Sequence, residues 1–132
     1  QNLSDIRLRD ASTLLSGGRY EGAYYLAGYA VECALKSCIC RTQVAGRFPP
    51  RRDIVGRMYS HDIPDLVRLA GPGLALATAR GANANLDSSW KQIELWSEQS
   101  RYALADQQDA QALYDAVSDP LDGVLQWLRS HW

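Results

Sequence analysis

Apolar residues recur along most of the chain at the three- and four-residue spacing of an α-helix, whereas the alternating pattern of a strand is nearly absent. The periodic segments are interrupted by glycine and proline. This pattern predicts an all-α bundle. Its helices are expected at about residues 4–16, 20–41, 63–70, 74–80, 86–94 and 106–129.

Capping and breaking residues mark several of these boundaries. Ser4 is expected to be the N-cap of the first helix, and Gly17-Gly18 ends it. Asp62 can cap a helix that carries Pro64 in its first turn. Pro120 is expected to kink the last helix or to restart it. The inward face of that helix is predicted to contain Ala110, Leu113, Val117, Leu121, Val124, Leu125 and Leu128.

Segment 20–41 is predicted to be the central helix, because small residues follow one face of it and allow a neighbouring helix to approach closely. A second stripe contains Tyr25, Tyr29, Glu32 and Lys36. The two tyrosines can cover an interface, and Glu32 with Lys36 forms a favourable i,i+4 pair. The alternative is a partly solvated face with one weak ion pair. The small residues are Ala23, Ala27, Ala30, Ala34 and Ser37.

The helical pattern breaks between residues 42 and 60, where a loop is expected. This loop concentrates positive charge, with Asp53 as its single acid. Guanidinium groups match phosphate oxygens, so the loop can hold an anion; the alternative is a solvated basic run. The arginines are Arg47, Arg51, Arg52 and Arg57.

Negative charge gathers later in the chain. Residues 86–123 hold eight acidic and two basic side chains, a local charge of −6, although the formal charge of the whole chain is only −1. The near-neutral total argues against capture of nucleic acid by the whole surface. The acidic segment either solubilises the protein or meets the basic loop of another subunit or a basic partner.

Length and composition indicate one globular domain spanning residues 1–132, with 46% apolar and 22% charged residues. The three cysteines, Cys33, Cys38 and Cys40, lack zinc-site spacing, so we expect small core or near-core side chains and no metal or cofactor. The chain shows neither 18 consecutive apolar residues nor a signal peptide. We therefore expect a soluble cytoplasmic protein without membrane contact.

Stock nucleotide-binding and zinc-protease motifs are absent from the sequence. His61 can act as an acid or base near neutral pH, or can be a structural hydrogen-bonding group. Arg101 beside Tyr102 can grip a phosphate next to a stacking ring; alternatively, Arg101 bonds Glu32 or another buried acid and locks its connector onto the central helix.

Three segments of the chain together fit the pattern of one known family: Arg19-Tyr20-Glu21-Gly22-Ala23-Tyr24-Tyr25-Leu26-Ala27-Gly28-Tyr29-Ala30-Val31-Glu32-Cys33-Ala34-Leu35-Lys36, His61-Asp62-Ile63 and Arg101-Tyr102. They resemble the HEPN domain, the higher eukaryotes and prokaryotes nucleotide-binding family. The resemblance implies a compact up-and-down bundle of four to five helices, paired into a homodimer. It also implies a role in RNA cleavage, in toxin–antitoxin or other defence systems, or beside a small nucleotidyltransferase.

Catalytic HEPN proteins carry an arginine followed, after four to six residues, by a histidine. Neither His61 nor His131 has an arginine at that spacing, and Arg57 precedes His61 with three residues between. Without a nearby imidazole, an arginine can stabilise phosphorane charge but cannot readily move the 2′-hydroxyl proton. The favoured hypothesis is thus a non-catalytic module for a nucleotide, RNA or partner protein. Its expected ligand-binding residues are Glu32, Lys36, Arg57, His61, Arg101 and Tyr102.

Two other hypotheses stay open. One is an RNA-cleaving toxin, independent of metal, in which Arg57 or Arg101 is brought to His61 in space. The other is an assembly subunit whose helix faces only dimerise.

Overall fold

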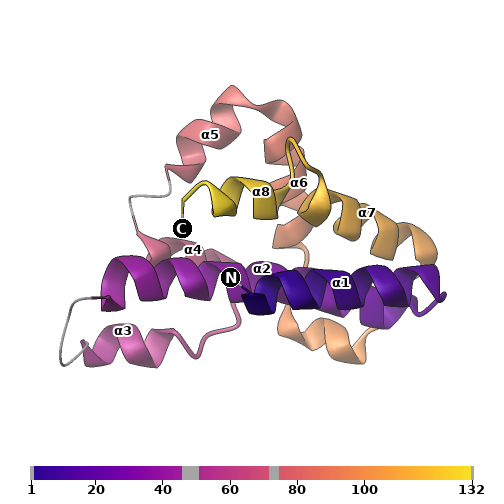
Figure 1. Cartoon of the computed structure of the whole chain (residues 1–132), viewed down its shortest axis with the longest axis horizontal. Helices are drawn as coiled ribbons and strands as arrows, with labels where there is room; N and C mark the ends of the chain where they lie inside the picture. The colour runs from indigo at the N-terminus through magenta and orange to yellow at the C-terminus, as the bar shows by residue number, and fades with distance from the viewer. Residues whose placement is uncertain (1, 46–50, 72–74, 132) are drawn as a thin grey trace.

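The computed structural model describes residues 2–45, 51–71 and 75–131, and contains helices but no strand within those ranges. The all-α prediction is confirmed (Figure 1). The α-helices are α1 (Asn2–Ser16), α2 (Tyr20–Ile39), α3 (Arg52–Arg57), α4 (Ile63–Ala70), α5 (Leu76–Ala82), α6 (Ala84–Glu94), α7 (Gln107–Ser118) and α8 (Val124–Arg129). A π-helical turn, η1 (Cys40–Val44), extends α2, and a 3₁₀-helix, η3 (Glu98–Tyr102), lies between α6 and α7.

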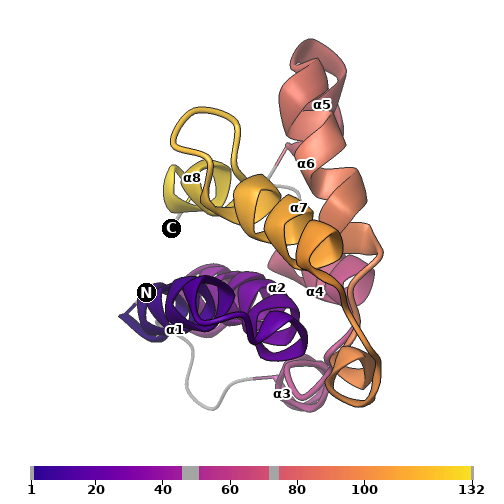
Figure 2. The same cartoon turned by 90° about the vertical axis from the view of Figure 1, so that its right-hand side faces the viewer.

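Helix α2 is the centre of the fold, as its small residues predict. Ala23, Ala27, Ala30 and Ala34 are all fully buried. Figures 1 and 2 show α1 lying alongside α2, with α7 and α8 on one side of this pair. Because these side chains are small, the neighbouring helices can approach α2 closely, and larger apolar residues fill the space around the contact.

Ser4 does not cap α1, so that prediction is wrong. The helix already begins at Asn2, and Ser4 is fully buried inside it. Its hydroxyl Oγ donates a hydrogen bond to the carbonyl oxygen of Ala30 in α2, at 2.8 Å. A buried hydroxyl requires a partner, and the neighbouring helix supplies it. Ser4 therefore joins two helices instead of starting one.

The predicted loop at 42–60 is partly helical. The chain continues from α2 through η1, and α3 forms further on. Burial of Ile54 accounts for the helical form of α3. A helical turn puts this side chain in the core beside α4 and leaves the polar residues of the segment on the opposite, solvent-exposed side. Arg47 lies outside the described residues. This additional helix is one reason why the described part of the chain contains eight α-helices, whereas the hydrophobic pattern predicts six.

The last predicted helix is the other reason, because it divides at Pro120. Helix α7 starts behind the N-cap Asp106, whose Oδ1 accepts the amide N–H of Asp109 at 2.8 Å, and it ends at Ser118. Asp119 Oδ1 then accepts the amides of Leu121 and Asp122 in a tight turn. That turn carries Leu121 outward, to 84% exposure, so its predicted inward position is wrong. The other six residues predicted on that face are buried.

The N-cap prediction for α4 is confirmed. Asp62 Oδ1 accepts the amide of Asp65 at 2.6 Å, and Pro64 lies in the first turn, where its missing N–H leaves no hydrogen bond unmade. Ile63, Leu66 and Leu69 bury one face of the helix. Because α4 packs against α2, the residue that precedes the cap, His61, is held near the middle of the central helix.

Candidate functional site

A buried carboxylate lies at the centre of the candidate site. Glu32, on α2, is only 1% exposed. Its Oε1 accepts a hydrogen bond from Lys36 Nζ at 2.8 Å, which forms the i,i+4 pair that the sequence predicts. A carboxylate removed from water is tolerated only when donors replace the lost hydration. Lys36 supplies one donor from the same helix, and the second comes from a distant part of the chain.

The second donor is His61, in the segment between α3 and α4. Its Nδ1 lies 3.0 Å from Glu32 Oε1 and 3.1 Å from Oε2. An ionised carboxylate only accepts hydrogen bonds, so Nδ1 carries the proton and donates it. The other ring nitrogen, Nε2, lies 3.4 Å from Glu98 Oε2, and the side chain is 45% exposed. One imidazole thus faces two carboxylates.

Glu98 belongs to η3 and connects His61 to Arg101. Arg101 Nη2 lies 3.4 Å from Glu98 Oε2, and the guanidinium carbon lies 5.2 Å from the centre of the Tyr102 ring. The start of η3 is stabilised by reciprocal hydrogen bonds between Ser97 and Ser100. We call the linked side chains the Glu32 cluster. Its members, in order of contact, are Lys36, Glu32, His61, Glu98 and Arg101.

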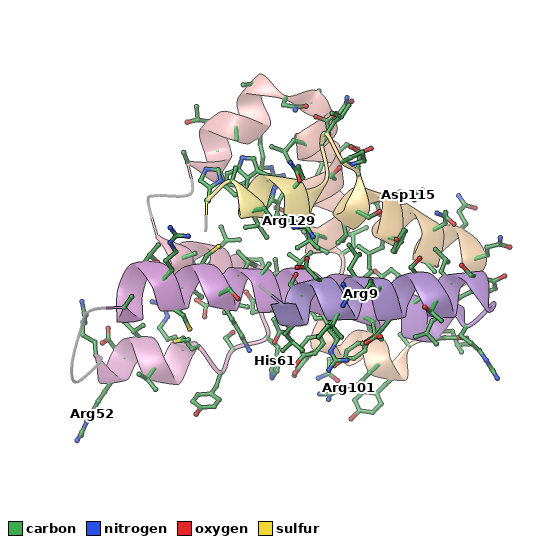
Figure 3. All side chains as sticks on the ribbon, in the orientation of Figure 1. Arg9, Arg52, His61, Arg101, Asp115 and Arg129 are labelled. Carbon is green, nitrogen blue, oxygen red and sulfur yellow. The ribbon has the colours of Figure 1, made fainter. Side chains whose placement is uncertain are left out.

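Figure 3 shows His61 and Arg101 close together on one side of the central helices. Trp96, just before η3, is 4% exposed, and its ring lies against the backbone of α2 at Gly28. This packing anchors the connector. It places Glu98 and Arg101, which follow Trp96 in the chain, beside His61. The position of the site therefore depends on one aromatic ring as much as on its ion pairs.

Most of the predicted ligand-binding residues converge, with one exception and one correction. Glu32, Lys36, His61 and Arg101 belong to the cluster, and Tyr102 extends from its end with 79% of its surface exposed. Arg57 instead donates to Asp65 at 2.9 Å, and this hydrogen bond holds the pKa of Asp65 below its ordinary value. The alternative Arg101–Glu32 ion pair does not form in the described structure, where Arg101 pairs with Glu98.

Glu98 was not among the expected site residues. Its signal in the sequence is the three-residue spacing to Arg101, which places an acid and a base on one side of a helical turn. The contact with His61, 37 positions earlier, has no local signature, because it depends on how the connector packs against α2.

The basic region 51–57 is largely compensated. Arg51 binds Asp53 through Nε at 3.1 Å and Nη2 at 2.8 Å, and this contact lowers the pKa of Asp53. Helix α3 contains two arginines. Arg57 is paired with Asp65, and Arg52 forms no ion pair with any described residue. Figure 3 shows Arg52 far along the molecule from His61 and Arg101. The described part of the basic region is thus separate from the Glu32 cluster.

A hollow of about 590 Å³ adjoins the cluster, between the start of α1, the second half of α2 and η1. Tyr29, Lys36 and Arg41 line it, together with Glu32 and Cys33. Burial is the largest cause that raises the pKa of Cys33, so this thiol stays protonated at neutral pH and is not an activated nucleophile. The part of the chain that the structure describes contains no group of three or more His, Cys, Asp or Glu side chains arranged to hold a metal ion.

Comparison with protein-family models, with curated proteins and with solved structures found no match for this chain. The HEPN resemblance of the three sequence segments therefore stays a prediction. Among residues 2–45, 51–71 and 75–131, no helix has both the length and the apolar character needed to cross a membrane.

Proposed function

We propose that the protein is a non-catalytic HEPN-like module that binds a phosphate-bearing ligand, a nucleotide or an RNA segment, at the Glu32 cluster. The observation that carries this proposal is the arrangement of Arg101: its guanidinium is held by Glu98 and lies over the exposed ring of Tyr102. A positioned guanidinium donates to phosphate oxygens in a planar fork, and an exposed aromatic ring offers a face on which a base can stack.

The hollow beside the cluster extends the same chemistry. Lys36 and Arg41 supply positive charge there, and Tyr29 supplies a second aromatic surface. The carboxylates of Glu32 and Glu98 hold cationic side chains in place and reduce the entropy that these side chains lose when they bind an anion. A ligand with both a charged and a planar part matches this combination of groups.

The surroundings of His61 favour binding of RNA or a nucleotide over cleavage of RNA. Both of its ring nitrogens face carboxylates, Nδ1 toward Glu32 and Nε2 toward Glu98. A general base must offer an unprotonated nitrogen to the hydroxyl that it activates. In this arrangement Glu98 lies where that hydroxyl would approach. The imidazole therefore acts as a structural bridge within the binding surface.

The proposal is tested by fluorescence anisotropy with two probes, labelled ATP and a labelled single-stranded RNA of ten nucleotides. Arg101→Gln is expected to weaken binding of the probe by about tenfold or slightly more, since a charge-assisted hydrogen bond contributes about 1.5 kcal/mol. Arg52→Gln is the matched control: it removes the same charge at a distant place and is expected to change affinity less than twofold. Equal losses in both variants, or binding of neither probe by the wild type, would contradict the proposal.

The HEPN resemblance adds that the module works as a homodimer or with a partner protein such as a small nucleotidyltransferase, in a toxin–antitoxin or other defence system. Analytical ultracentrifugation of the purified chain tests the homodimer, for which the expected mass is twice that of the chain. Co-purification of a nucleotidyltransferase without binding of either probe would favour the protein partner over the phosphate-bearing ligand.

A second candidate function is metal-independent RNA cleavage, and one observation favours it. Glu32 fixes the tautomer and orientation of His61 through Nδ1, as a carboxylate does for a catalytic histidine, and Arg101 belongs to the same cluster. Arg57 does not take part, because Asp65 holds it. Degradation of single-stranded RNA in the presence of EDTA, lost in His61→Ala, would establish this function and overturn the non-catalytic one.

A further inference from the structure

His61 joins two carboxylates that belong to different parts of the fold. Glu32 is on the central helix α2 and is buried, whereas Glu98 is on η3 and is 30% exposed. The imidazole stands between them, with Nδ1 at 3.0 Å from Glu32 and Nε2 at 3.4 Å from Glu98. Any change in the charge of this ring therefore alters the contact between α2 and η3.

The two protonation states of the ring act differently on this contact. In the neutral ring, Nδ1 keeps its proton for the buried Glu32, so Nε2 presents a lone pair to the oxygen of Glu98. Two acceptors at that distance repel each other. In the imidazolium, Nε2 also carries a proton, and the ring attracts both carboxylates at once. Only the charged ring bridges the two elements.

We propose that His61 is a pH-operated latch that fastens η3 to α2 when its ring is protonated and releases η3 when the ring is neutral. The latch does not depend on the proposed ligand, because it is a property of the contact between His61 and Glu98. A histidine suits the role, since an imidazole changes charge between about pH 5 and pH 8 while a solvated glutamate stays ionised.

The other charged groups around the ring complete this account. Lys36 faces Glu32 from α2 and keeps that carboxylate compensated in both states of the ring. Arg101 faces Glu98 from η3 and remains its partner when the ring is neutral. The neighbouring Arg57 and Asp65, on α3 and α4, pair with each other. Glu98 is therefore the carboxylate whose partners change with pH.

The release is local, because Trp96 anchors the chain just ahead of η3. Its buried ring stays against α2 whatever the charge of His61. The freedom gained on release belongs to residues 98–102, and so to the segment that carries Arg101 and Tyr102. The latch thereby sets how firmly these two exposed side chains are held.

The latch is tested by NMR on the ¹⁵N-labelled full chain between pH 8 and pH 5.5. We expect the backbone amide signals of residues 98–102 to shift in step with the His61 ring. Glu98→Gln should remove most of this shift while the ring still titrates. His131→Gln is the matched control: it deletes the other histidine, which packs on Trp127 at the end of the chain, and should leave the shift intact.

A double-mutant cycle of His61→Gln and Glu98→Gln, measured by urea unfolding, provides a second readout. Glutamine at position 61 keeps an N–H donor for Glu32, so the buried carboxylate is not left unpaired. At pH 5.5 we expect the two substitutions to be non-additive by about two- to fivefold in the unfolding equilibrium constant, the range of a partly exposed ion pair. At pH 8 they should be additive.

The latch is wrong if amides 98–102 do not follow the titration of His61, or follow it as strongly in Glu98→Gln. It is equally wrong if the coupling between residues 61 and 98 is the same at both pH values.

Discussion

Gly28 lies where the ring of Trp96 crosses α2. A Cβ atom at this position would stand 2.4 Å from three atoms of the indole ring. The ring is buried and also packs on Tyr25, with ring centres 6.0 Å apart, so it cannot move aside freely. The absence of a side chain at residue 28 therefore positions the connector that carries η3.

We expect Gly28→Ala to lower the free energy of unfolding by about 1–3 kcal/mol, the usual cost of overpacking, although alanine favours the helix. Urea denaturation measures this. Gly81→Ala in α5 is the matched control: a Cβ there meets nothing within 4 Å, and we expect a gain of about 0.5–1 kcal/mol. Two gains of equal size would show that Trp96 does not restrict residue 28.

Glu32 provides the second prediction at the scale of single residues. Glu32→Gln keeps the shape of the side chain but removes the charge that Lys36 and His61 compensate. It also directs an amide donor at groups that are themselves donors. We expect a loss of about 1–3 kcal/mol in the free energy of unfolding.

The control for this experiment is Glu21→Gln, an exposed acid in the first turn of the same helix, where a change within about 0.5 kcal/mol is expected. A loss at Glu32 no larger than at Glu21 would mean that the buried carboxylate does not depend on its two partners.

At the scale of elements, α5 is attached to the rest of the fold by the partly buried side chains of Leu76 and Ala79 and by the ion pairs of Arg80. None of its side chains is buried, and Figure 2 shows it at the far end from α1 and α2. Arg80 connects it to α6: Nε donates to Asp87 Oδ1 at 2.6 Å, and Nη1 pairs with Glu94. An element held in this way can open without unfolding the core.

Arg80→Gln is expected to speed amide hydrogen exchange in residues 76–82 by about two- to tenfold, from the loss of two partly exposed ion pairs. Lys91→Gln is the control, because Lys91 also pairs with Asp87 but lies on α6 itself. Unchanged exchange in Arg80→Gln would show that apolar contacts hold α5.

The same attachment has a predictable dependence on pH. Hydrogen bonds from Lys91 first, and from Arg80 second, lower the pKa of Asp87 below its ordinary value of 3.8. A lowered pKa means that the pairing stabilises the fold above pH 3.8 and is lost as the pH falls through the lowered value. Exchange in α5, corrected for its intrinsic pH dependence, should therefore be constant from pH 7 to pH 5 and rise below pH 4. A rise near pH 6 would contradict this assignment.

Elements with strong local signals could be predicted from the sequence, and those fixed by distant packing could not. Asp62 caps α4 as expected, since an N-cap is a contact within three residues. Asp106, where the last helix was expected to begin, caps α7 by the same local contact. Ser4 appeared to be such a cap, but a carbonyl of another helix, 26 residues away, takes its hydroxyl. Helix α3 was not predicted, because Ile54 is its one buried residue and a single apolar position gives no helical periodicity.

In the candidate site, too, contacts between residues close in sequence could be predicted and contacts between distant residues could not. The Glu32–Lys36 pair follows from a spacing of four residues on a helix, and the structure contains it. The contact of Glu32 with His61 spans 29 residues and has no local signal. It arises because the cap at Asp62 fixes the start of α4, which packs on α2. The sequence pattern suggested four members of the cluster, but not Glu98, which connects His61 to Arg101.

At the scale of the whole molecule, charge is distributed unevenly. Residues 86–123 carry −6, which leaves +5 on the rest of the chain. Figure 3 places Asp115, on α7, well away from His61 and Arg101. Within the cluster, each acid is paired with a cation, Glu32 with Lys36 and Glu98 with Arg101. Under the proposed function, we therefore expect an anionic ligand to be attracted to the cluster by local cations and not by the net charge of the protein.

This distinction can be measured through the salt dependence of RNA binding, and the prediction rests on the proposed function. Each phosphate contact with a single strand contributes about −0.7 to the slope of log affinity against log salt concentration. Arg101→Gln should therefore make the slope less steep by about 0.7. Asp115→Asn alters the net charge by the same amount on the distant acidic segment, where its carboxylate accepts a hydrogen bond from Gln111, and should leave the slope unchanged. The two substitutions change the net charge by one unit in opposite directions. If Asp115→Asn therefore makes the slope steeper by as much as Arg101→Gln makes it shallower, the RNA responds to the overall charge, and Arg101 does not contact a phosphate.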